Sequence, residues 1–131
     1  MPISDMPAHL DLIITADYPT LSAEFRLLDP QGSQIAFRHT DFKTIPVSRR
    51  LGLFDLRNYV RRFEPDREAA CVAEIGVSIA EQVFGEEIFR LLWASESQRT
   101  LRIRLPGATQ KENHLAAALA RVPWEIARPG I

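Results

Sequence analysis

The chain has 131 residues, of which 46% are hydrophobic and 25% are charged, as is typical of one soluble globular domain. Sixteen basic and seventeen acidic residues give a formal net charge of −1, so the overall charge argues against affinity for nucleic acid or an anionic membrane surface. The hydrophobic fraction also excludes an intrinsically disordered chain.

The first half of the chain opens with an alternation of apolar and polar residues, which predicts β-strands. Residues 10–16 place Leu10, Leu12 and Ile14 on one face, and residues 22–28 alternate in the same way. We expect these two strands to be neighbours in a meander.

A third strand is predicted over residues 34–39, with Ile35 and Phe37 directed inward and Gln34 and Arg38 outward. It follows Asp-Pro-Gln-Gly-Ser, in which proline presets a turn angle and glycine tolerates positive φ. The second and third strands should therefore form a hairpin with a loop of about five residues.

Helical periodicity begins near residue 49 and continues to residue 95. Apolar residues at intervals of three, four and three predict one helix over residues 49–63, whose inward face is Leu53, Leu56, Val60 and Phe63. A second helix is expected from Pro65 to about Phe84, because proline and acidic residues suit its first turn and Gly85 suits its C-terminal cap. A shorter third helix should cover residues 86–95.

The second helix carries an inward face with many small side chains. We expect this face to consist of Ala69, Val72, Ala73, Gly76, Ile79, Ala80 and Val83. The small residues at positions 69, 73, 76 and 80 would let another backbone segment approach closely.

The last third begins with a strand at Thr100 to Leu105, whose strict alternation predicts a half-buried strand with one arginine face. A polar loop is expected at residues 107–113. The order β-β-β-α-α-α-β predicts an α+β fold in a single domain over residues 1–131, with a mostly antiparallel sheet of about four strands packed on one face by helices.

Few residues in this chain have a catalytic or metal-binding context. Cys71 cannot form an internal disulfide, and together with His9, His39 and His114 it gives no zinc-ligand spacing, so we expect no metal and no cofactor. Cys71 lies about one turn inside its helix, where a buried structural role is expected. A small hydrolase that uses Cys71 as nucleophile, with His114 as a partner in space, is kept as an alternative.

Basic residues gather in one part of the sequence: Lys43, Arg49, Arg50, Arg57, Arg61 and Arg62. Arg57 and Arg61 are four residues apart and share a helix face. The cluster is expected to be a solvated face or a surface for an acidic protein partner, and we expect no nucleic acid and no membrane as partners.

The most informative pattern lies between residues 76 and 126. Gly-Val-Ser-Ile-Ala-Glu-Gln-Val-Phe-Gly-Glu-Glu-Ile starts at Gly76, the alternating strand follows, and then comes Leu-Ala-Arg-Val-Pro-Trp-Glu from Leu119 to Glu125. This order resembles the region ahead of the catalytic core in bacterial CHAT proteins, the caspase-like cysteine peptidase family. In that family a helix ending in Phe-Gly precedes an alternating strand and a Leu-Ala-x-Leu-Pro-Trp-Glu motif, so Val122 stands where leucine is usual.

The resemblance implies that the catalytic histidine and cysteine lie beyond the Pro-Trp-Glu motif, so we assign no catalytic residue here. The chain is expected to be the non-catalytic N-terminal part of a longer CHAT-type protein, with residues 114–131 leading into the peptidase core. It would act as an accessory or interaction domain for that core and for a regulatory protein. The docking residues are expected to be Leu119, Pro123, Trp124 and Glu125, in a tail that packs loosely or contacts a neighbour.

A different functional class is a stand-alone homodimeric binding module, which would use the strand at Leu101–Leu105 or the outer edge of the hairpin. The first seven residues are not a secretory signal, and no run approaches the length of about 18 apolar residues that a membrane span needs. A cytoplasmic protein is the simplest expectation.

Overall fold

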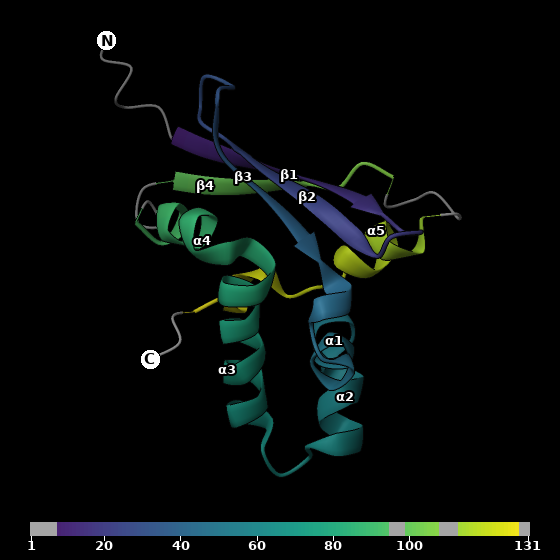
Figure 1. Cartoon of the computed structure of the whole chain (residues 1–131). Helices are drawn as coiled ribbons and strands as arrows, with labels where there is room; N and C mark the ends of the chain where they lie inside the picture. Colours follow the sequence, from purple (N-terminus) through teal and green to yellow (C-terminus); the bar gives the residue numbers. More distant parts are fainter. Residues whose placement is uncertain (1–7, 95–98, 108–112, 129–131) are drawn as a thin grey trace.

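The computed structural model describes residues 8–94, 99–107 and 113–128 and shows an α+β fold (Figure 1). The elements are β1 (Ala8–Asp17), β2 (Ser22–Leu28), β3 (Gln34–Asp41), α1 (Val47–Phe54), α2 (Leu56–Phe63), α3 (Glu68–Ser78), α4 (Gly85–Ala94), β4 (Arg99–Arg104) and α5 (His114–Leu119). Short 3₁₀ turns lie at Phe42–Thr44 and Trp124–Ile126, and a π-helical turn at Ile79–Phe84 joins α3 to α4. Most of the predicted polar loop and the end of the predicted third helix lie outside the described residues.

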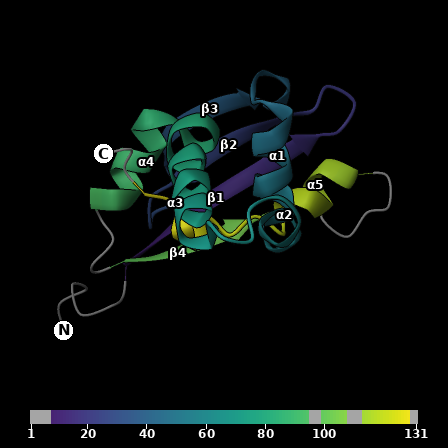
Figure 2. The same ribbon diagram turned by 90° about the horizontal axis from the view of Figure 1, so that it is seen from below.

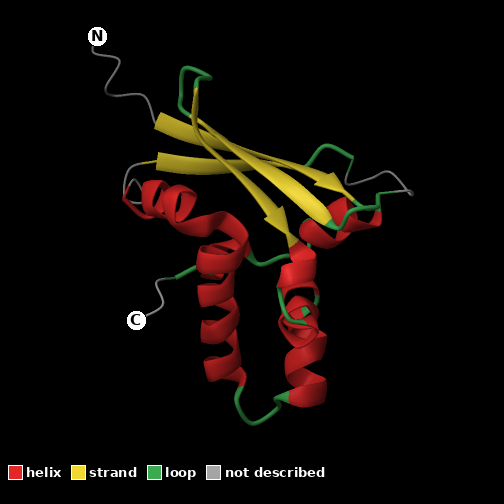
Figure 3. Ribbon diagram, viewed as in Figure 1, coloured by secondary structure: helices red, strands yellow, loops and turns green. Residues whose placement is uncertain are grey.

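One mixed sheet holds the strands in the order β3-β2-β1-β4. β1 pairs antiparallel with β2, and β2 pairs antiparallel with β3, which confirms the meander and the hairpin. β4 instead pairs in parallel with β1, because the helices between β3 and β4 return the chain to the end of the sheet where β1 starts. Figure 3 shows that the helices lie below the sheet, so one sheet face is covered and the other is open.

The covered face is built by the predicted alternation in β1 and β2. Leu12 and Ile14 of β1 and Phe25 and Leu27 of β2 have no exposed surface. Burying four large apolar side chains stabilises this layer, at about 1.5–3 kcal/mol for each fully buried side chain.

The orientation predicted for β3 was wrong, because a β-bulge shifts its register. Leu27 pairs with Ala36 and Leu28 pairs with Gln34, which leaves Ile35 as an extra residue. A one-residue shift moves side chains to the opposite face of a strand. Ile35 and Phe37 are therefore 39% and 49% exposed on the open face, and Ala36 is buried against the helices.

Polar contacts hold β3 in this register against the helical layer. The buried Thr40 hydroxyl donates a hydrogen bond to the Val83 carbonyl oxygen at 2.7 Å. Arg38, which was expected to point outward, reaches beneath the sheet and donates to the carbonyl oxygen of Gln82 at 3.3 Å. These two bonds tie the edge strand to the π-helical turn.

The helix predicted over residues 49–63 is two helices, because the chain bends at Asp55. The Asp55 backbone has φ −153° and ψ 66°, which ends α1 and starts α2. Its carboxylate accepts a hydrogen bond from Asn58 at 2.8 Å, a local bond of the kind that makes aspartate favour helix ends. Val60 is buried as predicted, but Phe63 is 55% exposed, so the prediction was wrong for that residue.

The inward face predicted for α3 is correct in its second half and wrong in its first turn. Ala69 is exposed, and Cys71 and Ile75 are buried in its place. At Gly76 the expected close approach of another backbone is confirmed, because the Arg128 N–H donates to the Gly76 carbonyl oxygen at 3.2 Å. Gly85 has φ +80°, the conformation that favours glycine at the end of a helical turn.

The C-terminal segment packs firmly on the core, so the expectation of a loose tail from residue 115 was wrong. Asn113 caps α5 by accepting a hydrogen bond from the Ala116 N–H at 3.0 Å, and the apolar residues of α5 are buried. Trp124 then stacks on Phe84 with ring centroids 5.3 Å apart and meets Phe25 edge-on at 6.4 Å. Aromatic contacts of this kind anchor the segment beneath the sheet.

Substituting Gly76→Ala should destabilise the protein, because a Cβ at this position would collide with the Ile126 carbonyl oxygen. A backbone atom can move only if the whole segment shifts, so we expect the free energy of unfolding to fall by about 1–3 kcal/mol. Gly52→Ala is the matched control, since the atoms nearest its Cβ would belong to the side chains of Ile75 and Tyr59 and not to the backbone. Urea unfolding followed by tryptophan fluorescence compares the two variants, and equal losses would contradict the interpretation.

Asp11 should make the attachment of β4 depend on pH. Arg102 donates to the two carboxylate oxygens of Asp11 at 2.8 and 3.1 Å, and this hydrogen bonding lowers the pKa of Asp11. A lowered pKa in the folded state means that the stabilisation is present above the ordinary pKa of aspartate and is lost as pH falls through the lowered value.

We therefore expect smaller hydrogen-exchange protection factors for β4 amides at acidic pH, and the same change at neutral pH for Asp11→Asn. The amides between β2 and β3 serve as an internal control. If the protection factors of β4 amides were the same in Asp11→Asn as in the unmodified protein, the Asp11–Arg102 pair would not be what attaches β4 to β1.

Candidate functional site

A groove of about 630 Å³ lies between α2, the start of α3 and the segment that follows α5. Figure 2 shows this segment running between α3 and α2 when the molecule is seen from below. The groove is thus formed by two consecutive helices and by a segment about fifty residues further along the chain. Its apolar lining consists of Phe54, Leu56, Val60, Pro65, Val72 and Pro123.

Local sequence explains the shape of each wall. The bend at Asp55 starts α2, and the segment Glu-Pro-Asp at residues 64–66 ends α2 and turns the chain into α3. Pro123 cannot continue a helix, so α5 ends and the chain passes into the turn that carries Trp124. Because Trp124 is stacked on Phe84, it fixes the adjoining Pro123 at the groove.

Three arginines line the same groove, namely Arg57, Arg61 and Arg121. Arg57 and Arg61 are one turn apart on α2 and share a side of that helix. All three are exposed, and none is within 4.0 Å of a carboxylate among the residues that the structure describes. The groove therefore combines an apolar lining with guanidinium groups that are free to bind an anion.

Two carboxylates also line the groove and limit its positive charge. Asp55 accepts the hydrogen bond of Asn58, and Glu68 stands in the first turn of α3, where the helix dipole favours a negative charge. The three arginines and two carboxylates thus give the groove an excess of one positive charge.

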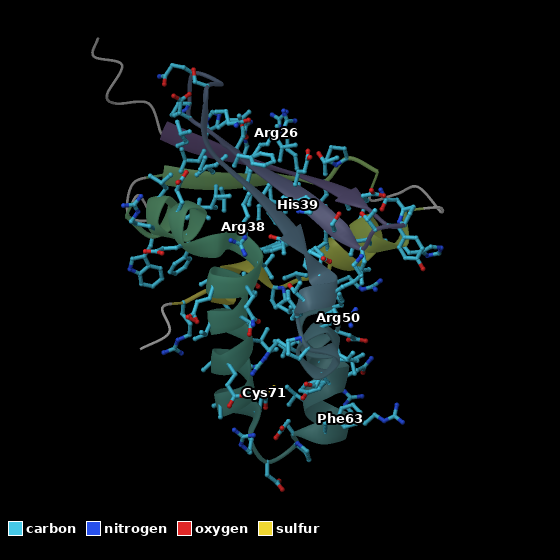
Figure 4. The ribbon with its side chains drawn as sticks, in the orientation of Figure 1. Arg26, Arg38, His39, Arg50, Phe63 and Cys71 are labelled. Atoms are coloured by element: carbon cyan, nitrogen blue, oxygen red, sulfur yellow. The ribbon has the colours of Figure 1, made fainter. Side chains whose placement is uncertain are left out.

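The basic cluster predicted from the sequence is divided between several environments. Arg49 lies 3.7 Å from Glu74, and Arg50 donates to the Ile45 carbonyl oxygen at 3.1 Å. Arg62 lies over the Phe63 ring, 5.6 Å from its centroid. The labelled side chains of Arg50 and Phe63 in Figure 4 come from α1 and α2. Of the cluster, Arg57 and Arg61 line the groove.

The four predicted docking residues have different environments. Leu119 has no exposed surface, so it packs inside the chain and cannot contact a neighbour in this structure. Pro123 is half-buried at the groove, and Trp124 is half-buried in the aromatic stack. Glu125 is exposed and has no ion pair within the described part of the chain. Docking through Pro123, Trp124 and Glu125 stays a prediction.

Cys71 has the buried position that was expected for a structural residue. Its side chain is 2% exposed, and burial, followed by the nearby carboxylates of Glu64 and Glu74, raises the pKa of the thiol. His114 begins α5 and packs against Tyr18, with ring centroids 5.0 Å apart. The Cys71–His114 pairing therefore has no contact that supports it.

Within residues 8–94, 99–107 and 113–128, no three histidine, cysteine, aspartate or glutamate side chains gather as a metal site would require. None of the helices in these ranges has the length and apolar character needed to cross a membrane.

The open face of the sheet is a second exposed surface. Phe37 of β3 lies opposite Arg26 of β2, and His39 lies opposite Glu24. Arg26 and His39 are labelled on this face in Figure 4. This surface has an exposed apolar edge, which the sequence pattern had placed in the core.

Sequence reasoning missed the groove and the role of Arg121 in it. Arg57 and Arg61 were recognised by their spacing, but no spacing rule links them to a residue sixty positions later. Comparisons of the chain with protein-family models, curated proteins and solved structures find no match.

We expect the Cys71 thiol to react very slowly with iodoacetamide at neutral pH in the folded protein. Both its burial and its raised pKa reduce the fraction of accessible thiolate, which is the reactive form. Mass spectrometry should detect full labelling only after unfolding in urea. Rapid labelling of the folded chain would instead favour a nucleophilic role for Cys71.

Proposed function

We propose that this chain is a non-catalytic protein-interaction domain that supports or regulates a caspase-like peptidase core of the CHAT type in the cytoplasm. One observation carries the proposal. The segment that resembles the CHAT motif forms a wall of the groove, through Arg121 and Pro123. The sequence feature that suggests the family thus forms part of a groove that could receive a partner.

The conformation of this segment supports a docking role. Trp124 is held by Phe84 and Phe25, so the backbone on either side of it has a defined position. Pro123 faces the groove, and Glu125 is exposed. A segment that is rigid before it binds loses less conformational entropy on association than a flexible one.

The environment of Cys71 favours a binding role over thiol catalysis. Catalytic thiols need a lowered pKa and access to substrate, whereas this thiol is buried and its pKa is raised. We therefore infer that any catalytic cysteine belongs to the proposed core.

A homodimeric module is the second candidate, because the bulge in β3 exposes Ile35 and Phe37 beside the edge of the sheet. An edge strand with apolar side chains is suited to pairing with another strand. Size-exclusion chromatography with light scattering distinguishes a stable dimer from a monomer.

The decisive experiment uses the polypeptide encoded directly after Ile131. We expect it to contain a caspase-like core and, when expressed separately, to bind the 131-residue chain in isothermal titration calorimetry. Glu125→Lys should weaken binding by about tenfold, because it would set a positive charge against the group of the core that pairs with Glu125, and like charges across an interface repel each other. Glu24→Lys is the matched control, since Glu24 is exposed on the open face of the sheet.

The proposal is contradicted if no such core is encoded there, or if the core does not bind the chain. Equal weakening by the two lysine variants would place the contact away from Glu125. A tight dimer that is disrupted by Phe37→Asp would favour the homodimeric module.

A further inference from the structure

We propose that the groove between α2, α3 and residues 121–123 binds a short acidic segment of a partner protein. A large apolar side chain of that segment would occupy the apolar lining, and flanking carboxylates would bind the arginines. The inference deepens the proposed function and rests on it, since it assumes that the chain is a protein-interaction domain.

The apolar lining provides the contact for the large side chain. Val60 is buried at 8% exposure, and Val72 and Leu56 are half-buried, so these groups contribute apolar surface to the lining of the groove. A volume of about 630 Å³ is within the range of roughly 300–1,000 Å³ that ligand pockets have. Removing this apolar surface from water would favour binding.

The arginines provide charge complementarity. Arg57 and Arg61 are separated by one helical turn, so about 5–6 Å separates their Cβ atoms, a spacing that suits two carboxylates of one short segment. Each guanidinium can bind a carboxylate through two parallel hydrogen bonds. Arg121 extends the positive surface to the opposite wall.

Some other arginines of the chain are held by carboxylates of the chain itself. Arg67 is within 3.1 Å of Glu64 and 3.0 Å of Glu74, and Arg102 is within 2.8 Å of Asp11. Arg57, Arg61 and Arg121 differ in having no such partner in the described part of the molecule, although all three line one groove. Among the described residues, Arg38, Arg50 and Arg62 also lack a carboxylate partner but do not line the groove. What distinguishes the groove is that three unpaired guanidinium groups border one apolar lining.

An acidic peptide fits this surface better than a nucleic acid does. Asp55 and Glu68 would repel a continuous phosphate backbone, whereas the carboxylates of a peptide can be spaced to avoid them. Bases would also need aromatic platforms. Among the described lining residues Phe54 is the one aromatic side chain, and its ring packs on Phe42 with centroids 5.8 Å apart, so the groove has no row of aromatic rings for successive bases.

The test uses fluorescence polarisation with a synthetic peptide that carries a fluorescein label and has three glutamates on each side of a central Leu-Phe pair. One control peptide replaces the glutamates by glutamines, and another replaces Leu-Phe by two alanines. We expect the parent peptide to bind at low salt, and each control peptide to bind at least about tenfold more weakly, because both contacts contribute.

The protein variants locate the site. Combining Arg57→Glu with Arg61→Glu should weaken binding by at least about tenfold, because the repulsion falls on the proposed carboxylate positions. Arg62→Glu is the matched control, since it reverses a charge on the same helix but does not line the groove. Arg62→Glu should retain binding within about twofold. Circular dichroism checks that each variant is folded.

Several results would overturn the inference. These are equal loss in the Arg62→Glu variant, equal binding of the glutamine peptide, and no binding of the parent peptide up to about 1 mM. Tighter binding of single-stranded DNA at the same arginines would assign the groove to nucleic acid. A dimer of the chain that dissociates when Arg57 and Arg61 are reversed would assign the groove to a second copy.

The peptide measurement separates this inference from the proposed function. If the caspase-like core binds the chain but the peptide does not, the proposed peptide site is contradicted and the proposed function is supported. If the peptide binds at the groove but no core binds the chain, the proposed function is contradicted and the proposed peptide site is supported.

Discussion

The packing of Trp124 against Phe84 and Phe25 is the interaction on which the rest of this structure depends. Phe25 belongs to the sheet, Phe84 ends the π-helical turn, and Trp124 belongs to the C-terminal segment. One aromatic cluster therefore joins three elements from the beginning, middle and end of the chain. Because residues 126–128 then pass close to Gly76, the C-terminal segment is held at two points on the helical layer.

The attachment of the C-terminal segment also shapes the groove on the surface of the molecule. The segment between α5 and Trp124 lies beside α2 and α3, so the same packing that completes the core forms one wall of the groove. A wall that aromatic contacts already hold in place does not need to be ordered by a partner. Binding to it would therefore cost less conformational entropy than binding to a flexible segment. In the proposed function, stability and binding would share the residues around Trp124, although Trp124 itself packs on Phe84 and Phe25 of the core.

Local patterns in the sequence were enough to predict most elements but not all their orientations. Alternation located β1, β2 and β4, and the small residue Gly76 correctly indicated a close backbone approach. The bulge at Ile35 reversed the predicted faces of β3, because a register shift is set by packing on the helices and not by the residues of the strand alone. The groove was beyond sequence reasoning, because its walls meet only through long-range packing.

The different environments of the arginines connect folding with function. Exposed ion pairs contribute little to stability, about 0–1 kcal/mol in most cases, so leaving an arginine unpaired at the surface costs the folded chain little. Arg57, Arg61 and Arg121 are therefore free to interact with a partner without weakening the core that Trp124 completes. A net charge of −1 conceals this local excess, because most acidic residues lie elsewhere in the chain. The distribution of charge, and not its sum, is what suits the groove to an acidic segment.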